Sequence, residues 1–188
     1  MNNPANIWNK LQEEYKKRMT ITKSISPACR EIKDILQKES GKCLDVGCGV
    51  VIPPAYMSDN LEYYGIDPIN LNEDKINCIC GKAENLIYKD CFFDVVLIIT
   101  ALDHIAQPEL AIKEAYRVLK KKGKFIYYGG VFKVSNYLNW KNKDKFAQID
   151  KKHIWMFDNK SMMDLCKEFS FIRSKRIGKF DYIYLFEK

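Results

Sequence analysis

One stretch, residues 43–49 with the sequence Cys-Leu-Asp-Val-Gly-Cys-Gly, constrains the fold of this chain more than any other. Its first four residues suit a buried strand, and Gly47 and Gly49 then break that strand with one residue between them. Glycine has no Cβ and adopts positive φ without strain, so such a turn lets the backbone approach a ligand closely. Pro53 and Pro54 suit the first turn of a following helix. A strand, glycine turn and helix predict a nucleotide-like ligand at the carboxyl end of a parallel sheet.

The composition describes one globular domain. The chain has 188 residues, of which 47% are hydrophobic and 29% are charged, and a chain of this size can bury a core without disulfides or a structural metal. It has no apolar run long enough to span a membrane, and residues 1–6 lack the charge and the apolar block of a signal peptide. We therefore expect a cytoplasmic protein with no membrane partner.

The net charge and the cysteine spacing indicate which ligands and partners to expect. The formal net charge of +7 comes mostly from dispersed lysines, which is more typical of a soluble surface than of a nucleic-acid footprint. The seven cysteines lack the Cys-x-x-Cys spacing of zinc or redox sites. We expect no nucleic-acid partner and no metal site. We also expect reduced cysteines in the core, among them Cys43, Cys78, Cys80, Cys91 and Cys166.

Hydrophobic periodicity predicts an alternation of strands and helices. The expected helices lie at residues 7–19, between Ser26 and Gly41, between Pro108 and Gly123, and from Asp158 to Phe169. The expected strands are residues 43–46, 61–66, 75–79, 92–99, 124–128, 171–176 and 182–186. Alternation favours a parallel sheet with right-handed crossovers. The last two strands are joined by a short connection containing Gly178 and must therefore pair antiparallel.

Five motifs follow one another along this pattern. They are Leu-Asp-Val-Gly-Cys-Gly at 44–49, Tyr-Gly-Ile-Asp at 64–67, Gly-Lys-Ala-Glu-Asn-Leu at 81–86, Phe-Asp-Val-Val at 93–96 with Ala-Leu-Asp-His-Ile at 101–105, and Glu-Ala-Tyr-Arg-Val-Leu-Lys at 114–120. In this order they resemble the class I S-adenosylmethionine-dependent methyltransferases, in particular the methyltransferase type 11-like branch acting on small molecules. The resemblance runs over residues 42–130, with a weaker continuation to the end.

The resemblance implies an α/β fold. It would be a Rossmann-like three-layer sandwich, whose seven-stranded, mostly parallel sheet has an antiparallel last strand and helices on both faces. The whole chain, 1–188, would form one domain. Within it, 1–40 would be an N-terminal helical cap, 41–130 the cofactor-binding core, 129–157 the acceptor-pocket segment, and 158–188 the closing helix and strands.

The resemblance also implies S-adenosyl-L-methionine as cofactor, with S-adenosyl-L-homocysteine as product. Asp67 follows Gly49 by 18 residues, a spacing close to that of a carboxylate beside the ribose of a bound nucleoside. Asp45 would order the glycine turn or contact the cofactor through water, or would be a satisfied buried carboxylate. The expected cofactor-binding set is Asp45, Gly47, Cys48, Gly49, Asp67, Pro68, Lys82, Ala83, Glu84, Thr100 and Ala101.

Asp103 and His104 follow the fourth strand, and the resemblance places this pair beside the methyl donor and acceptor. Histidine exchanges protons near neutral pH, so His104 could act as a general base, or it could order the loop by hydrogen bonding. His153 is a weaker candidate. The implied acceptor is a small molecule, with oxygen favoured over nitrogen or carbon as the accepting atom. The oligomeric state is not predicted.

Two departures from the family pattern leave alternatives open. Val51 stands where relatives often carry a third glycine, and Lys82 stands where they often carry an acidic residue that accepts from the adenine amine. Lysine has no acceptor. A non-catalytic binding or scaffold protein with this fold is one alternative, and a nucleic-acid methyltransferase is another. A nicotinamide-dependent oxidoreductase is disfavoured, because Ile52 occupies the third glycine position of G-x-G-x-x-G.

Overall fold

The computed structural model describes residues 26–49, 54–68, 77–131 and 155–188. These residues form a seven-stranded sheet with the order β3-β2-β1-β4-β5-β7-β6. The strands are β1 (Gly41–Val46), β2 (Leu61–Asp67), β3 (Cys78–Cys80), β4 (Phe93–Ile99), β5 (Leu119–Gly130), β6 (Ser170–Arg176) and β7 (Asp181–Glu187). Strand β7 pairs antiparallel with both of its neighbours, and the pairs from β3 to β5 are all parallel. The predicted mostly parallel sheet and the antiparallel closing hairpin are confirmed.

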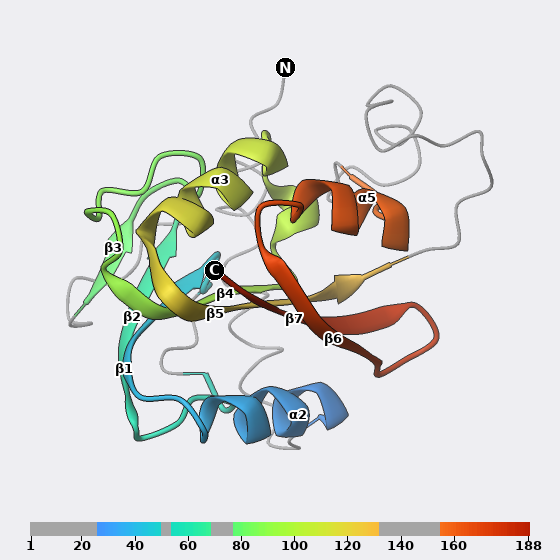
Figure 1. The fold of residues 1–188 in the computed structure, drawn as a ribbon, viewed down its shortest axis with the longest axis horizontal. Helices are drawn as coiled ribbons and strands as arrows, with labels where there is room; N and C mark the ends of the chain where they lie inside the picture. Colours follow the sequence, from blue (N-terminus) through green and yellow to red (C-terminus); the bar gives the residue numbers. More distant parts are fainter. Residues whose placement is uncertain (1–25, 50–53, 69–76, 132–154) are drawn as a thin grey trace.

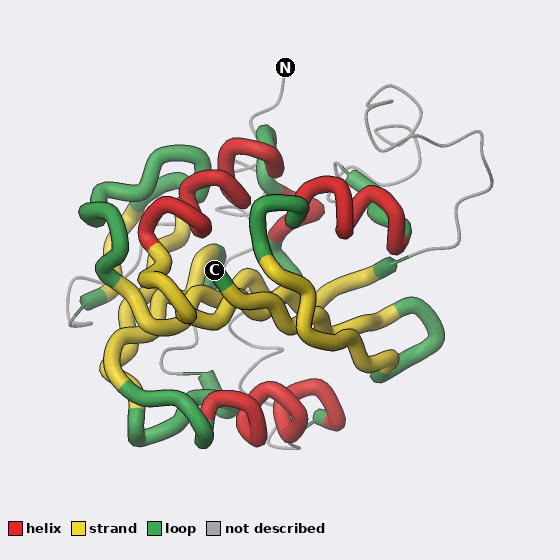
Figure 2. The backbone as a smooth tube through the Cα atoms, in the orientation of Figure 1, coloured by secondary structure: helices red, strands yellow, loops and turns green. Residues whose placement is uncertain are grey.

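Helices cover both faces of the sheet, as predicted. Helix α2 (Pro27–Leu36) lies on one face, and α3 (Pro108–Val118) and α5 (Asn159–Leu165) lie on the other (Figure 1). Figure 2 shows the same arrangement as a layer of strands between two layers of helix. This is the predicted three-layer sandwich.

The central strand β4 explains why both faces must be covered. Val95 and Leu97 belong to the core cluster beneath α2, whereas Val96 and Ile98 belong to the cluster beneath α3 and α5. All four are 0% exposed. Successive residues of a strand point to opposite faces, so an uninterrupted apolar run is buried only between two helical layers.

The predicted helix starts are confirmed at two caps. The Ser26 hydroxyl accepts a hydrogen bond of 3.1 Å from the Cys29 amide, with Pro27 in the first turn of α2. Asp158 and Ser161 form a reciprocal capping box at the start of α5.

Two predicted helix ends were too late in the chain. Helix α3 ends at Val118 rather than near Gly123, because Leu119 already pairs with Phe93 and begins β5. Helix α5 ends at Leu165, and Phe169 beyond it is buried against the ring of Phe125 at a centroid distance of 4.8 Å.

The helix predicted to begin at Pro53–Met57 is wrong for its described part, because residues 54–60 form turns. The Met57 amide donates to the Pro54 carbonyl at 3.0 Å. Tyr56 is buried in this segment, and its hydroxyl donates to Asp45 at 2.7 Å.

The predicted core position of the cysteines is only partly right. Cys43 and Cys166 are buried, but Cys80 and Cys91 are exposed, and all seven are free thiols. Strand β3 begins at Cys78 rather than at residue 75. Residues 7–19, 50–53 and 132–154, with the predicted first helix, Val51 and His153, lie outside the described residues.

Within the described ranges, none of the helices is both long enough and apolar enough to cross a membrane. The division of the chain into a cap, a cofactor-binding core and an acceptor-pocket segment stays a prediction.

Candidate functional site

The turn after β1 requires glycine for two separate reasons. Gly47 and Gly49 have φ of +76° and +64°, which L side chains rarely adopt. A Cβ added to Gly47 would also lie 2.4 Å from the Cβ of Ala101, at the exit of β4. The Gly47 amide donates to the Ile66 carbonyl at 2.7 Å. The carboxyl ends of β1, β2 and β4 therefore meet at this turn.

Asp67 binds the same turn. Its Oδ2 accepts a hydrogen bond of 2.8 Å from the Gly49 amide, and the residue is only 6% exposed. Pro68 follows it on the surface, and its carbonyl accepts a bond of 3.7 Å from the Cys80 thiol. Asp67 thus presents a carboxylate beside the glycine turn, at the edge of the sheet where open α/β folds bind ligands.

Cys48 lies between the two glycines and is a neutral thiol. Its Sγ lies 2.8 Å from where a Cβ would stand on Gly65 of β2, so Gly65 leaves the space that this side chain occupies. Burial, with the negative charges of Asp45 and Asp67, raises the pKa of Cys48 far above that of a free thiol.

Asp45 is buried in β1 and bound by two tyrosines. Its Oδ2 accepts from the hydroxyls of Tyr56 at 2.7 Å and Tyr63 at 3.0 Å. Its Oδ1 is fully buried and has no hydrogen-bond partner among the residues that the structure describes. Burial is the largest cause that raises the pKa of Asp45 to about 6, against the two tyrosine hydrogen bonds that lower it.

The two tyrosines were absent from the predicted site, and a strand register could have found one of them. Tyr63 pairs with Cys43, and Asp45 stands two residues further along β1. Side chains two residues apart share a face of a strand. Tyr63 and Asp45 therefore lie on the same face, but the register between β1 and β2 was not known in advance.

The predicted loop at 81–86 follows β3 in the chain and is hydrogen-bonded to the end of β2. The Gly81 amide donates to the Asp67 carbonyl at 3.0 Å, and the Asn85 amide donates to the Lys82 carbonyl at 3.2 Å. Ala83 is buried in the core, whereas the Lys82 side chain is exposed. Glu84 accepts from the Gln107 amide at 3.3 Å, so this carboxylate binds the start of α3.

The exit of β4 forms a compact turn at Thr100 to His104. Thr100 has φ of +51° and donates its amide to the Tyr128 carbonyl at 2.7 Å. Asp103 and His104 lie in the short 3-10 helix η1 (Leu102–His104). Asp103 Oδ1 and His104 Nε2 are 3.7 Å apart, and the side chains are 25% and 17% exposed.

Trp155 stabilises this turn through two hydrogen bonds. It was not predicted as a site residue. Its amide donates to the Asp103 carbonyl at 3.2 Å, and its indole Nε1 donates to the Ile105 carbonyl at 2.7 Å. The two bonds bracket His104 in the chain. Trp155 is 4% exposed, and its contacts cross 50 residues of sequence, which a local pattern does not reveal.

The described residues thus gather the predicted cofactor-binding and catalytic positions at one edge of the sheet. Hydrogen bonds or close contacts join β1 to β2, β1 to β4, and β2 to the loop at 81–86. Within the described ranges, no group of three or more His, Cys, Asp or Glu side chains could hold a metal ion.

This fold is that of the class I S-adenosylmethionine-dependent methyltransferases. A solved SAM-dependent methyltransferase of Thermotoga maritima, described as a possible histamine N-methyltransferase, superposes with a TM-score of 0.71 over 97% of this chain and 99% of its own, at 23% identity. The family described as "Methyltransferase domain" matches residues 44–127 of this chain.

Two relatives show how far the sequence similarity extends. The ubiquinone/menaquinone biosynthesis C-methyltransferase UbiE of a Bradyrhizobium species is 44% identical over 54 residues, which are 29% of this chain and 21% of that protein. The chain therefore matches about a fifth of the length of this relative. An uncharacterized protein of Methanocaldococcus jannaschii is 29% identical over 172 residues, covering 88% of this chain and 81% of its own.

Proposed function

We propose that this protein transfers a methyl group from S-adenosylmethionine to a small-molecule acceptor. One observation carries the proposal. Within the region that matches the methyltransferase family, the Gly49 amide of the glycine turn after β1 donates a hydrogen bond of 2.8 Å to Asp67, a buried carboxylate at the end of β2. That arrangement suits a nucleoside ligand. The protein backbone of the turn can contact the nucleoside, and the carboxylate can accept hydrogen bonds from its hydroxyls.

The residues present fit this cofactor. Asp67 would accept from the ribose hydroxyls, because an ionised carboxylate offers only acceptors. Asp45 would order the glycine turn or contact the cofactor through water at Oδ1, the buried oxygen that has no hydrogen-bond partner among the described residues. When bound, S-adenosylmethionine supplies a methyl group already activated by the sulfonium charge. The protein would then contribute mainly orientation of donor and acceptor.

Asp103 and His104 are the proposed catalytic pair. His104 would take a proton from an acceptor that must lose one, and Asp103 at 3.7 Å would orient its ring. The alternative, in which His104 only orders the turn, is tested below. Oxygen stays the predicted accepting atom. Because one relative is a C-methyltransferase and one solved structure of the same fold is described as a possible N-methyltransferase, the acceptor panel must include carbon and nitrogen nucleophiles.

Calorimetric titration with S-adenosylmethionine and S-adenosylhomocysteine tests the proposal. The wild-type protein should bind both, and Asp67→Ala should abolish or strongly weaken the binding. Asp164→Ala, at an exposed position on α5, is the matched control and should bind as the wild type does. If neither ligand produces heat or a thermal shift, the methyltransferase proposal is wrong.

A second experiment separates the catalytic proposal from its alternatives. The protein is incubated with methyl-labelled S-adenosylmethionine and a panel of small molecules that offer oxygen, nitrogen or carbon nucleophiles. Parallel reactions contain tRNA or DNA. Label on a small molecule supports the proposal. Label on nucleic acid alone favours a nucleic-acid methyltransferase, and cofactor binding without any transfer favours a binding or scaffold protein.

A further inference from the structure

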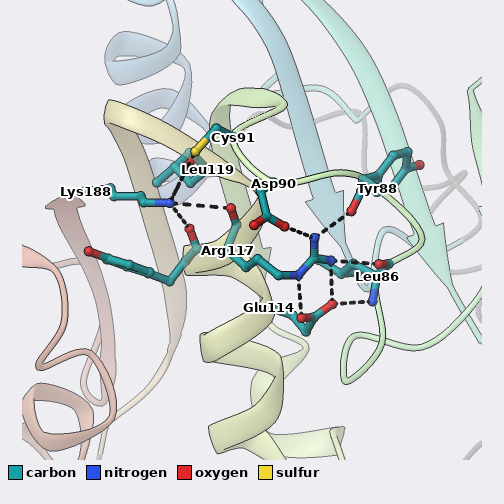
Figure 3. Close-up of polar contacts among 9 residues, drawn as sticks. Leu86, Tyr88, Asp90, Cys91, Glu114, Arg117, Leu119 and Lys188 are labelled. Carbon is teal, nitrogen blue, oxygen red and sulfur yellow. Dashed lines mark hydrogen bonds and ion pairs between the residues drawn. The ribbon is translucent and has the colours of Figure 1, made fainter.

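Two charged residues of α3, Glu114 and Arg117, bind the backbone at the end of the loop at 81–86 (Figure 3). Arg117 donates to the carbonyls of Leu86 at 2.9 Å and Tyr88 at 2.8 Å, and to the carboxylate of Asp90 at 2.7 Å. Glu114 Oε2 accepts from the Leu86 amide at 2.8 Å. Leu86 is thus held through both its N–H and its C=O.

The two side chains also bind each other in a two-pronged geometry. Arg117 Nε donates to Glu114 Oε1, and an Arg117 Nη donates to Oε2, both at 2.8 Å. The Arg117 side chain is 30% exposed and that of Glu114 is 18% exposed. The hydrogen bond from Arg117 lowers the pKa of Glu114, so both groups stay charged at neutral pH. Bidentate, charge-assisted pairs have fixed orientations, which a lysine could not reproduce.

The loop at 81–86 is therefore fixed at both ends. At its start, Gly81 donates to the carbonyl of Asp67 at 3.0 Å. At its end, Leu86 is bound by Glu114 and Arg117. The end of α3 is itself secured by Lys188, whose ammonium donates to the carbonyls of Tyr116 at 2.7 Å and Leu119 at 2.8 Å (Figure 3).

Three side chains of this loop, those of Lys82, Ala83 and Glu84, offer a base amine little to bind. The exposed Lys82 has three donors and no acceptor, Ala83 has no polar group, and Glu84 binds the start of α3. An amine on a nucleobase needs an acceptor, which the peptide carbonyls of the loop and the side-chain oxygen of the exposed Asn85 can supply. The position of these acceptors is set by the anchors at Asp67 and Leu86.

We propose that Glu114 and Arg117 are positioning residues for nucleobase selectivity: through Leu86 they hold the backbone of the loop at 81–86 in the geometry that accepts a base amine. This inference rests on the proposed function, since it concerns the same cofactor. The pair does not touch the cofactor. Loosening it should therefore reduce the preference for an amino base over a keto base, in addition to any loss of affinity.

The test compares two ligands by calorimetry, S-adenosylhomocysteine and S-inosylhomocysteine, which carries a carbonyl where adenine has its amine. The variants are Arg117→Lys, which keeps the charge and loses the fork, and Glu114→Gln. Arg176→Lys is the matched control, because Arg176 also binds backbone carbonyls, those of Gly178 and Lys179 in the β6–β7 connection. Melting temperatures are measured in parallel.

We expect the ratio of the two dissociation constants to fall by about tenfold in Arg117→Lys and to stay at the wild-type value in Arg176→Lys. Glu114→Gln should shift the ratio in the same direction, and it provides the test if Arg117→Lys does not fold. An unchanged ratio in folded variants, even with weaker binding of both ligands, overturns this inference and leaves the proposed function standing. Failure of the wild type to bind either ligand overturns both.

Discussion

The amide of Gly49 donates a hydrogen bond of 2.8 Å to Oδ2 of Asp67, 18 residues further along the chain. This bond links the turn after β1 to the end of β2 with the protein's own groups. The carboxylate of Asp67 is therefore oriented by the protein rather than by a ligand. Binding groups that are already ordered lose less conformational entropy when a ligand arrives.

Substituting Asp67 tests the value of that carboxylate. We expect Asp67→Asn to weaken S-adenosylhomocysteine binding by about tenfold and Asp67→Ala by about a hundredfold, because hydrogen bonds to a charged group are worth roughly 1.5–3 kcal/mol. Calorimetry on the two variants, with circular dichroism to verify folding, measures this. Wild-type affinity in Asp67→Ala would remove Asp67 from the proposed site.

Gly47 should tolerate no side chain, for the two reasons that its geometry gives. In Gly47→Ala the backbone keeps φ of +76°, and the new Cβ meets that of Ala101 at 2.4 Å. The positive φ alone costs roughly 1–2 kcal/mol. We expect the free energy of unfolding, measured in urea, to fall by more than that in the single variant. The double variant Gly47→Ala, Ala101→Gly should recover only the clash, and equal stabilities of the two variants would contradict this account.

The succession of strands along the chain was predictable because each strand has a local sequence pattern. Apolar runs such as Val95–Ile98 end at turn residues, and the alternation with helices restricts the connections. The helix expected after Pro54 failed for a non-local reason. Tyr56 binds Asp45 across the turn, and this contact competes with the helical preference of the segment.

The motif spacing predicted that Gly49 and Asp67 belong to one site, and the structure shows that the two residues are in contact. That they bind a cofactor stays a prediction. Contacts between residues that are distant in sequence were not predicted. Trp155 beside Asp103, and Arg117 beside Leu86, lie 52 and 31 residues apart in the chain. Such contacts depend on how α3 and the segment before α5 pack on the sheet, and no periodicity encodes that packing.

Because of Asp45, the free energy of unfolding should fall as the pH rises from about 4 to about 6. Its pKa is raised from 3.8 to about 6 in the folded protein, so between these values the folded state holds more protons than the unfolded state. The corresponding contribution is present below pH 3.8 and is lost as the pH passes 6. At 1.36 kcal/mol per pKa unit, the loss is about 3 kcal/mol.

Asp45→Asn isolates this effect. Asparagine does not titrate, so the free energy of unfolding of the variant relative to the wild type should increase by about 3 kcal/mol between about pH 4 and pH 7. Urea denaturation at several pH values measures the difference. Glu31, Asp94 and Glu114, whose pKa values are lowered, give the opposite trend in both proteins and cancel. A constant difference between the two proteins would show that Asp45 ionises normally.

His104 can be assigned between its two roles once the screen has found an acceptor. Both His104→Ala and His104→Gln should bind S-adenosylhomocysteine with the wild-type affinity, because the side chain lies on the acceptor side of the proposed site. If His104 is a general base, both variants lose roughly a hundredfold or more in transfer rate. Glutamine retains hydrogen-bonding groups but cannot take a proton, so a near wild-type rate in His104→Gln alone would assign the residue to ordering the turn. Single-turnover rates at saturating cofactor, measured for the two variants and for Asp103→Asn, decide between these outcomes.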